Sequence, residues 1–177
     1  MTYPWSSGDV LTASDLNAYA GLVPVKSQTI GTAVSSVTVT SAFSSTFDNY
    51  RIIIANGTGT VSGGGIYLSL GAGNTWYAHG TYELYSGTGY TVPQNATSTC
   101  FIGTMDTVNS GIGISLDIMA PGLATGSKVV GLFHGGGYGG RFWGINTNLS
   151  ANTAFTIAPT SGTLTGGTIK VYGYNNG

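Results

Sequence analysis

Apolar and polar residues alternate along most of the chain from residue 25 onwards, in short runs separated by Gly-, Ser- and Asn-rich segments. A period of two places successive side chains on opposite faces of a strand, so each run predicts a strand with one buried face. We predict an all-β fold, an antiparallel, jelly-roll-like β-sandwich of about ten strands. The clearest runs are Val37–Val39, Ile66–Leu70, Ile112–Ile118, Phe155–Ile157 and Ile169–Val171, with less regular ones at Phe101–Met105 and Val129–His134.

The segment Phe47–Ala55 differs from these runs, because three consecutive isoleucines follow Arg51. A short, uninterrupted run of β-branched residues favours a strand over a helix and is typical of a strand that is buried on both faces. We expect the rest of the sheet to pack over this strand. Arg51 enters it from a polar end, where its guanidinium is expected to stay hydrated or to pair with Asp48.

Two glycine-rich segments are predicted to be loops. Gly57–Ile66 favours a flexible hairpin connection, because glycine readily adopts the positive φ of tight turns. His134–Gly144 sets Tyr138, Arg141 and Trp143 among glycines. We expect this segment to be a mobile tip or a close contact between two backbones.

The N-terminal residues 1–23 are predicted to form a separate anchoring segment ahead of a sandwich domain at 24–177. Thr12 and Asp15 have the spacing of a capping box, and Gly21 is a typical C-terminal residue, so we expect a short helix over residues 13–20. Eight residues are too few for a stable isolated helix, so the segment has to dock on another surface. The predicted anchoring side chains are Tyr3, Trp5, Leu11, Leu16 and Tyr19.

The composition limits the classes of partner. Charged residues make up 6% of the chain and the net charge is −1, so the chain lacks the basic field that binding to nucleic acids or anionic membranes requires. No secretory signal is expected from the first residues, and no run is long enough to predict a membrane span. The single cysteine, Cys100, excludes an internal disulfide and a cysteine-based metal site.

No catalytic, metal or cofactor motif is found, and we expect a protein that is not an enzyme. The two histidines lie far apart in sequence, and the acidic residues share no short motif. A glycan-cleaving enzyme stays an alternative, because a pair of catalytic carboxylates meets in space rather than in sequence.

Aromatic residues gather in two segments and indicate a carbohydrate-binding surface. Flat rings beside planar polar groups suit the stacking and hydrogen bonding of a sugar. Ordinary sheet packing or a subunit interface is the alternative, because Tyr and Trp are enriched in both. The candidate glycan contacts are Trp76, Tyr77, His79, Glu83, Tyr138, Arg141 and Trp143.

The N-terminal sequence PWSSGDVLTASDLNAYAGL is similar to a segment that opens many tail, fibre and minor structural proteins of tailed bacteriophages. The matching positions are Trp5, Gly8, Asp9, Val10, Thr12, Ala13, Leu16 and Asn17. The strand FDNYRIII and the terminal run TGGTIKVYGY, Thr165–Tyr174, also resemble phage structural proteins. Together these pieces cover about a quarter of the chain. The resemblance implies a particle component that is attached through its N-terminus, and it implies no catalytic residues.

The sequence thus predicts a virion structural protein, in the first place a tail fibre or adhesion component that assembles in the host cytoplasm. Its expected partners are other virion proteins, further copies of the same chain, with a trimer favoured, and a glycan of the host surface. A capsid decoration or head-fibre protein is the nearest alternative. A stand-alone carbohydrate-binding module is a third possibility from a different class.

Overall fold

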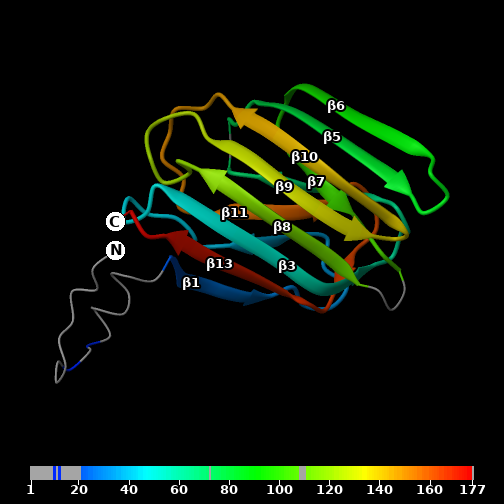
Figure 1. Cartoon of the computed structure of the whole chain (residues 1–177), viewed down its shortest axis with the longest axis horizontal. Coiled ribbons are helices and arrows are strands. Elements are labelled where there is room, and N and C mark those ends of the chain that lie inside the picture. The colour runs from blue at the N-terminus through cyan, green and yellow to red at the C-terminus, as the bar shows by residue number, and fades with distance from the viewer. Residues whose placement is uncertain (1–9, 11, 13–20, 72, 108–110, 177) are drawn as a thin grey trace.

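The computed structural model describes residues 10, 12, 21–71, 73–107 and 111–176. These residues form thirteen strands and no helix (Figure 1). The predicted helix at 13–20 and the predicted anchoring residues lie outside the described part. The strands are β1 (Leu22–Thr29), β2 (Val37–Val39), β3 (Asn49–Gly59), β4 (Gly65–Ser69), β5 (Trp76–Leu84), β6 (Gly89–Thr97), β7 (Cys100–Thr104), β8 (Ile112–Met119), β9 (Lys128–Gly135), β10 (Tyr138–Asn146), β11 (Phe155–Pro159), β12 (Leu164–Thr165) and β13 (Thr168–Tyr174).

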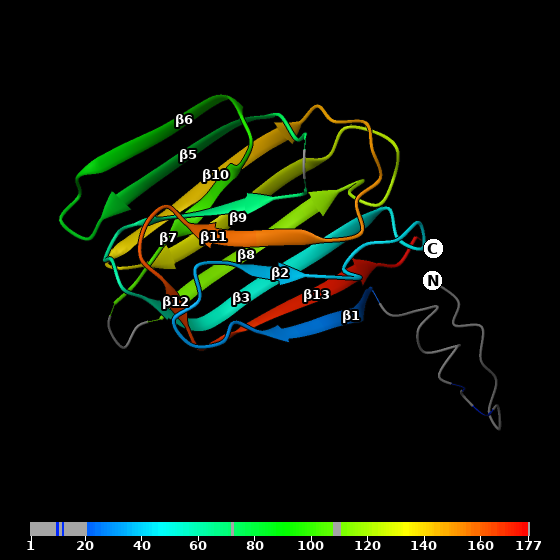
Figure 2. The same ribbon diagram turned by 180° about the vertical axis from the view of Figure 1, so that it is seen from behind.

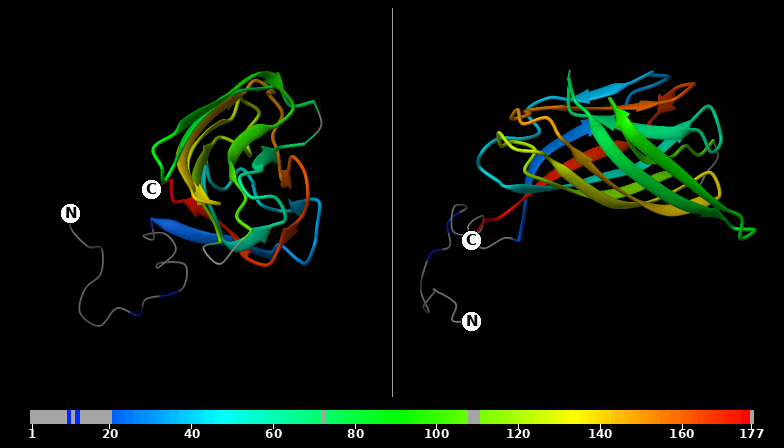
Figure 3. Two further views of the ribbon diagram at one scale, coloured as in Figure 1. Left: turned by 90° about the vertical axis from the view of Figure 1, so that its right-hand side faces the viewer. Right: turned by 90° about the horizontal axis from the view of Figure 1, so that it is seen from above.

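The strands form two antiparallel sheets. The large sheet has the order β1-β13-β3-β8-β9-β10-β5-β6, with β12 pairing beside it to β3, and the small sheet has the order β2-β11-β4-β7. The small sheet covers one face of the large one, which curves around it (Figures 2 and 3). The prediction of an all-β, antiparallel fold is confirmed, with thirteen strands in place of about ten.

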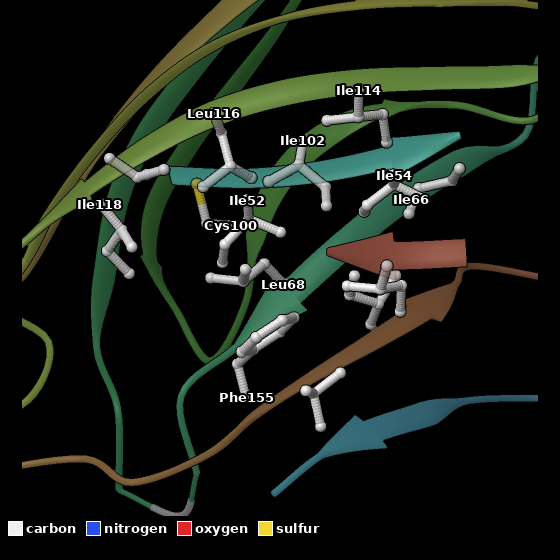
Figure 4. Close-up of a cluster of buried hydrophobic side chains, with 14 of the residues drawn as sticks. Ile52, Ile54, Ile66, Leu68, Cys100, Ile102, Ile114, Leu116, Ile118 and Phe155 are labelled. Carbon is white, nitrogen blue, oxygen red and sulfur yellow. The ribbon is translucent and has the colours of Figure 1, made fainter. Parts of the chain in front are cut away.

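The core under β3 and β8 is aliphatic. Ile52 lies opposite Leu116 and Ile54 opposite Ile114, and all four side chains are buried. Figure 4 shows them facing Leu68, Ile66 and Phe155 of the small sheet. Full burial of each such side chain contributes roughly 1.5–3 kcal/mol.

The outward residues of β3 overturn one prediction. Arg51 and Ile53 are only partly buried, on the face away from the small sheet. The strand is therefore buried on one face and not on both. An antiparallel sheet that is covered on one side produces this pattern, even where the sequence offers three isoleucines in a row.

The core under β5, β9 and β10 is aromatic. The ring of Phe101 stacks on that of Tyr82 and meets the ring of Phe133 edge-on. Glycines on the inward faces of the neighbouring strands make room for these rings. A Cβ at Gly80 would come within 2.5 Å of the Phe101 ring, and a Cβ at Gly131 within 2.5 Å of the Phe142 ring.

The predicted loop at His134–Gly144 turns out to be largely strand, and the one at Gly57–Ile66 is half strand and joins strands of two different sheets, so it is not a hairpin. β9 and β10 form a hairpin across Gly136 and Gly137, whose φ values of 64° and 77° are of the sign that a type I′ turn requires. β10 then continues to Asn146. β3 likewise runs on to Gly59 through a bulge after Ala55, which leaves residues 60–64 as the connection to β4.

The two edge strands of the large sheet each contain a proline and a bulge. β1 begins at Leu22 and includes Pro24, so the sheet starts two residues ahead of the predicted domain boundary. Its pairing with β13 shifts register next to that proline. β6 contains Pro93 and shifts register against β5. Proline lacks the N–H that a further strand would need, so it is tolerated at sheet edges and hinders strand addition there.

Neighbouring isoleucines of β3 provide a direct test of which face is buried. We expect Ile52→Ala to lower the free energy of unfolding by about 2–5 kcal/mol, because it leaves a cavity between the sheets. Ile53→Ala, the matched control, is expected to cost less than half as much, because this side chain is partly exposed on the outer face. Chemical denaturation followed by circular dichroism measures both. Equal losses would contradict the assigned faces.

Candidate functional site

The outer face of the large sheet, which faces the viewer in Figure 1, carries most of the exposed apolar side chains. The residues that alternate with the core residues of β8, β9, β10 and β5 point to this side. Strand register brings the outward residues into rows across the sheet, so that Asp117, Val130 and Trp143 lie beside one another and His79 follows Trp143.

Six large apolar residues are exposed together on these four strands. Their exposed fractions range from 38% for Met119 to 65% for Leu132. Contiguous exposed apolar surface of this kind is typical of an interaction site rather than of a free monomer surface. The apolar patch consists of Tyr77, Met119, Val130, Leu132, Trp143 and Ile145.

Trp143 and His79 form a flat platform at the edge of this patch. They are paired in register on β10 and β5, and their rings lie 5.9 Å apart between centroids, with 23° between the planes. Trp143 is 53% exposed. Together with Thr81 and Arg141, the two rings line an open depression of about 510 Å3. This volume is within the range of small-molecule sites, about 300–1,000 Å3.

Arg141 and Arg51 have different partners on this face. The Nε of Arg141 donates a long hydrogen bond, 3.4 Å, to Oγ1 of Thr81. The Nε of Arg51 lies 3.8 Å from Oδ1 of Asp117, which is the only ion pair formed between two described residues. Of the two predicted alternatives for Arg51, the pair with Asp48 is wrong, because Arg51 pairs with Asp117, while its side chain stays 38% exposed. Both partners of this pair are about one-third exposed, so its contribution to stability is small.

Asp117 also accepts a hydrogen bond from the Tyr174 hydroxyl, 2.6 Å long. Burial and this hydrogen bond raise the pKa of Tyr174 above its ordinary value. The Oδ1 of Asp117 is thus engaged by both a cation and a hydroxyl.

A shallow groove runs beside Arg141 towards the tip of the β5–β6 hairpin. Glu83 lies between Gly139 and Gly89 on the outer face. The space above both glycines is open, because a Cβ at either position would meet no atom closer than 3.9 Å. The resulting depression has a volume of about 550 Å3. At its far side, the Tyr85 hydroxyl lies 2.5 Å from Nε2 of His134, and the two rings stack.

The structure brings together most of the predicted glycan contacts. Tyr77, His79, Arg141 and Trp143 share the outer face, and Glu83 lies on the same face beside the groove.

Trp76 and Tyr138 contradict the prediction. Trp76 is fully buried, so it offers no ring to a ligand, and Tyr138 packs against the aromatic core. Both side chains point inwards because alternation along β5 and β10 places them on the core face.

Sequence reasoning missed the apolar half of the site. Val130, Leu132 and Ile145 were not among the predicted contacts, and only the register of β9 against β10 shows that they share the exposed face. In β9 the outward positions are as hydrophobic as the inward ones, so the hydrophobic pattern of the sequence alone did not show which side chains face outwards.

No metal centre or membrane span is found in the part of the chain that the structure describes. Within these residues, His, Cys, Asp and Glu side chains do not gather in groups of three or more that would hold a metal ion. The described residues also include no helix that is long and apolar enough to cross a bilayer.

Comparison with protein-family models, with curated proteins and with solved structures gives no match. The function therefore has to be argued from the geometry of this chain.

Cys100 is expected to be chemically silent in the folded protein. Its side chain is fully buried, and burial raises the pKa of its thiol from 9.0 to about 12. A disulfide reagent should leave the native thiol unmodified at pH 9, where a free thiol is about half ionised. In concentrated guanidinium chloride the same reagent should modify one thiol per chain. Rapid modification of the native protein would contradict the burial.

Proposed function

We propose that this chain is a structural subunit of a tailed-bacteriophage particle, in the first place a tail-fibre or adhesion component. Its N-terminal segment attaches it to the particle, and the outer face of its large sheet contacts the host surface or neighbouring subunits. The observation that carries the proposal is the apolar patch, a broad exposed surface on a chain with very few charges. Such a surface suits a protein that works in an assembly.

The strand order supports the finer description of the sandwich as a jelly roll. The order β1-β13-β3-β8 faces β2-β11-β4-β7. With these eight strands renumbered in chain order, the two sheets have the orders 1-8-3-6 and 2-7-4-5, which is the arrangement of a jelly roll. The hairpins β5–β6 and β9–β10 are then insertions that widen one sheet. Viral capsid and lectin domains use jelly rolls, so this topology favours a particle or carbohydrate-binding role.

The direction of the chain supports attachment at one end and contact at the other. Leu22 begins β1 beside Tyr174 of β13, at one end of the sandwich (Figure 1). The tip of the β5–β6 hairpin and the groove beside it lie at the opposite end. A subunit held through its N-terminal segment would therefore present the groove away from the particle.

A stand-alone carbohydrate-binding module is the second candidate. The observation that favours it is the Trp143–His79 platform, because a protein could use the same surface for glycans without belonging to a particle. The two candidates differ in the role of the N-terminal segment, which only a particle component requires. In the particle, we further propose a symmetric homo-oligomer, because most assemblies of identical chains have closed symmetry, and we keep the trimer that the sequence analysis favours.

Removal of residues 1–20 tests the attachment. We expect the truncated chain to keep its sheet, because β1 begins at Leu22, and to lose co-sedimentation with phage particles. Particles from an infection supplied with tagged full-length or truncated chain provide the measurement, with circular dichroism as the check on folding.

The full-length Leu149→Ala variant serves as the control and should still co-sediment, because Leu149 is an exposed apolar residue outside the apolar patch. A truncated chain that stays on the particle would refute attachment through this segment. A full-length chain that is absent from particles would leave the carbohydrate-binding module as the better description. Labelling of the particle by electron microscopy separates a tail position from a capsid position.

A further inference from the structure

The basic side chains of this protein are concentrated on one surface. Four of its five Lys and Arg residues lie on the outer face of the large sheet, at outward positions of β3, β9, β10 and β13. Two carboxylates share this face. Its formal charge is therefore +2, in a chain whose net charge is −1. The basic residues are Arg51, Lys128, Arg141 and Lys170, and the acidic ones are Glu83 and Asp117.

Arg141 is the cation of this face that lies against the aromatic platform. It is exposed, two residues from Trp143 along β10, and its bonded partner is the neutral hydroxyl of Thr81. Arg51, by contrast, already has the carboxylate of Asp117 beside it. An arginine that holds no carboxylate and stands beside a flat ring retains its capacity for a bidentate bond to a planar anion.

We infer that the depression lined by His79, Thr81, Arg141 and Trp143 binds a carboxylate-bearing sugar of an acidic polysaccharide. The indole of Trp143 stacks on the apolar face of the sugar ring, the guanidinium of Arg141 pairs with its carboxylate, and the Thr81 hydroxyl hydrogen-bonds to a ring substituent. The open groove beside Arg141 accommodates the neighbouring sugars of the polymer, whose hydroxyls can donate to the Glu83 carboxylate that also lines this groove. This inference rests on the proposed contact role of the outer face and names the class of its ligand.

The dimensions and chemistry of the site agree with this assignment. A depression of about 510 Å3 is large enough for one or two sugar rings, and the second depression of about 550 Å3 adjoins it at Thr81 and Arg141. The site is open and shallow, which suits a long polymer passing across a sheet. The formal charge of +2 on this face favours the approach of an anion over that of a neutral sugar.

Binding of matched oligosaccharides to the full-length chain tests the ligand class. The probes are hexasaccharides of galacturonic acid, of hyaluronan and of sialic acid, each beside its carboxyl-reduced counterpart, which has the same sugar skeleton without the charge. Calorimetric titration at low ionic strength is the measurement. We expect at least one acidic hexasaccharide to bind about tenfold or more tightly than its reduced form, because a hydrogen-bonded charge is lost.

Two pairs of variants locate the site. Arg141→Gln should weaken binding of the acidic hexasaccharide about tenfold or more, whereas Lys170→Gln, which removes the same charge from the same face, should change it less than about twofold. Trp143→Ala should weaken binding by a similar factor, and Leu149→Ala, which truncates another exposed apolar side chain, should leave it unchanged. Thermal unfolding and sedimentation of each variant check its fold and oligomeric state.

Several outcomes would overturn this inference. Equal binding of acidic and reduced probes, or no binding of any probe, would exclude a carboxylate-specific site. Equal losses of affinity in Arg141→Gln and Lys170→Gln would mean that the acidic hexasaccharide is attracted by the overall charge of the face and not bound by Arg141. A changed oligomeric state in Trp143→Ala would mean that another copy of the chain covers the patch. None of these results bears on co-sedimentation with particles, so the attachment role is judged separately.

Discussion

The packing of β3 and β8 against the small sheet is the interaction on which the two-layer arrangement depends. It buries Ile52 and Leu116 side by side, and this fixes the register of the two strands, because a shift by one residue would turn every apolar side chain outwards. The same register sets the outer face. Arg51 lies opposite Asp117 because Ile52 lies opposite Leu116, and each further strand continues the row as far as Trp143 and His79.

The sequence predicts this fold best where a strand is buried on one face. Residues 112–118 alternate strictly, and the structure places a strand there. The prediction of a strand fails where apolar and polar side chains do not alternate. In residues 134–144, glycines take inward as well as outward positions, so the strand shows no apolar–polar alternation and resembles a loop. A Cβ at the inward Gly140 would come within 2.5 Å of the Tyr82 Cβ, whereas the outward Gly139 is open. Trp76 fails for another reason: aromatic clustering says nothing about direction, which depends on pairing with Asn146.

The candidate site belongs to the part of the large sheet that lies outside the eight strands of the proposed jelly roll. Val130, Arg141, Trp143 and His79 come from the hairpins β9–β10 and β5–β6, and these hairpins rest on their own aromatic core around Phe101 and Phe133. Their inward glycines let the rings lie close to the backbone. The inward side chains of the hairpins thus stabilise the fold, while the outward side chains are available to bind a ligand.

The prolines of β1 and β6 have a consequence for how identical chains meet. Few charges are available to keep copies of this protein apart by repulsion in a crowded cell. An unprotected edge strand can then pair with a strand of another chain. Pro24 and Pro93, with the adjoining bulges, make both margins of the large sheet poor templates for growth into fibrils. In the proposed assembly, contact between subunits would thereby be made by side chains, whose shape can select a partner, and not by the backbone, which cannot.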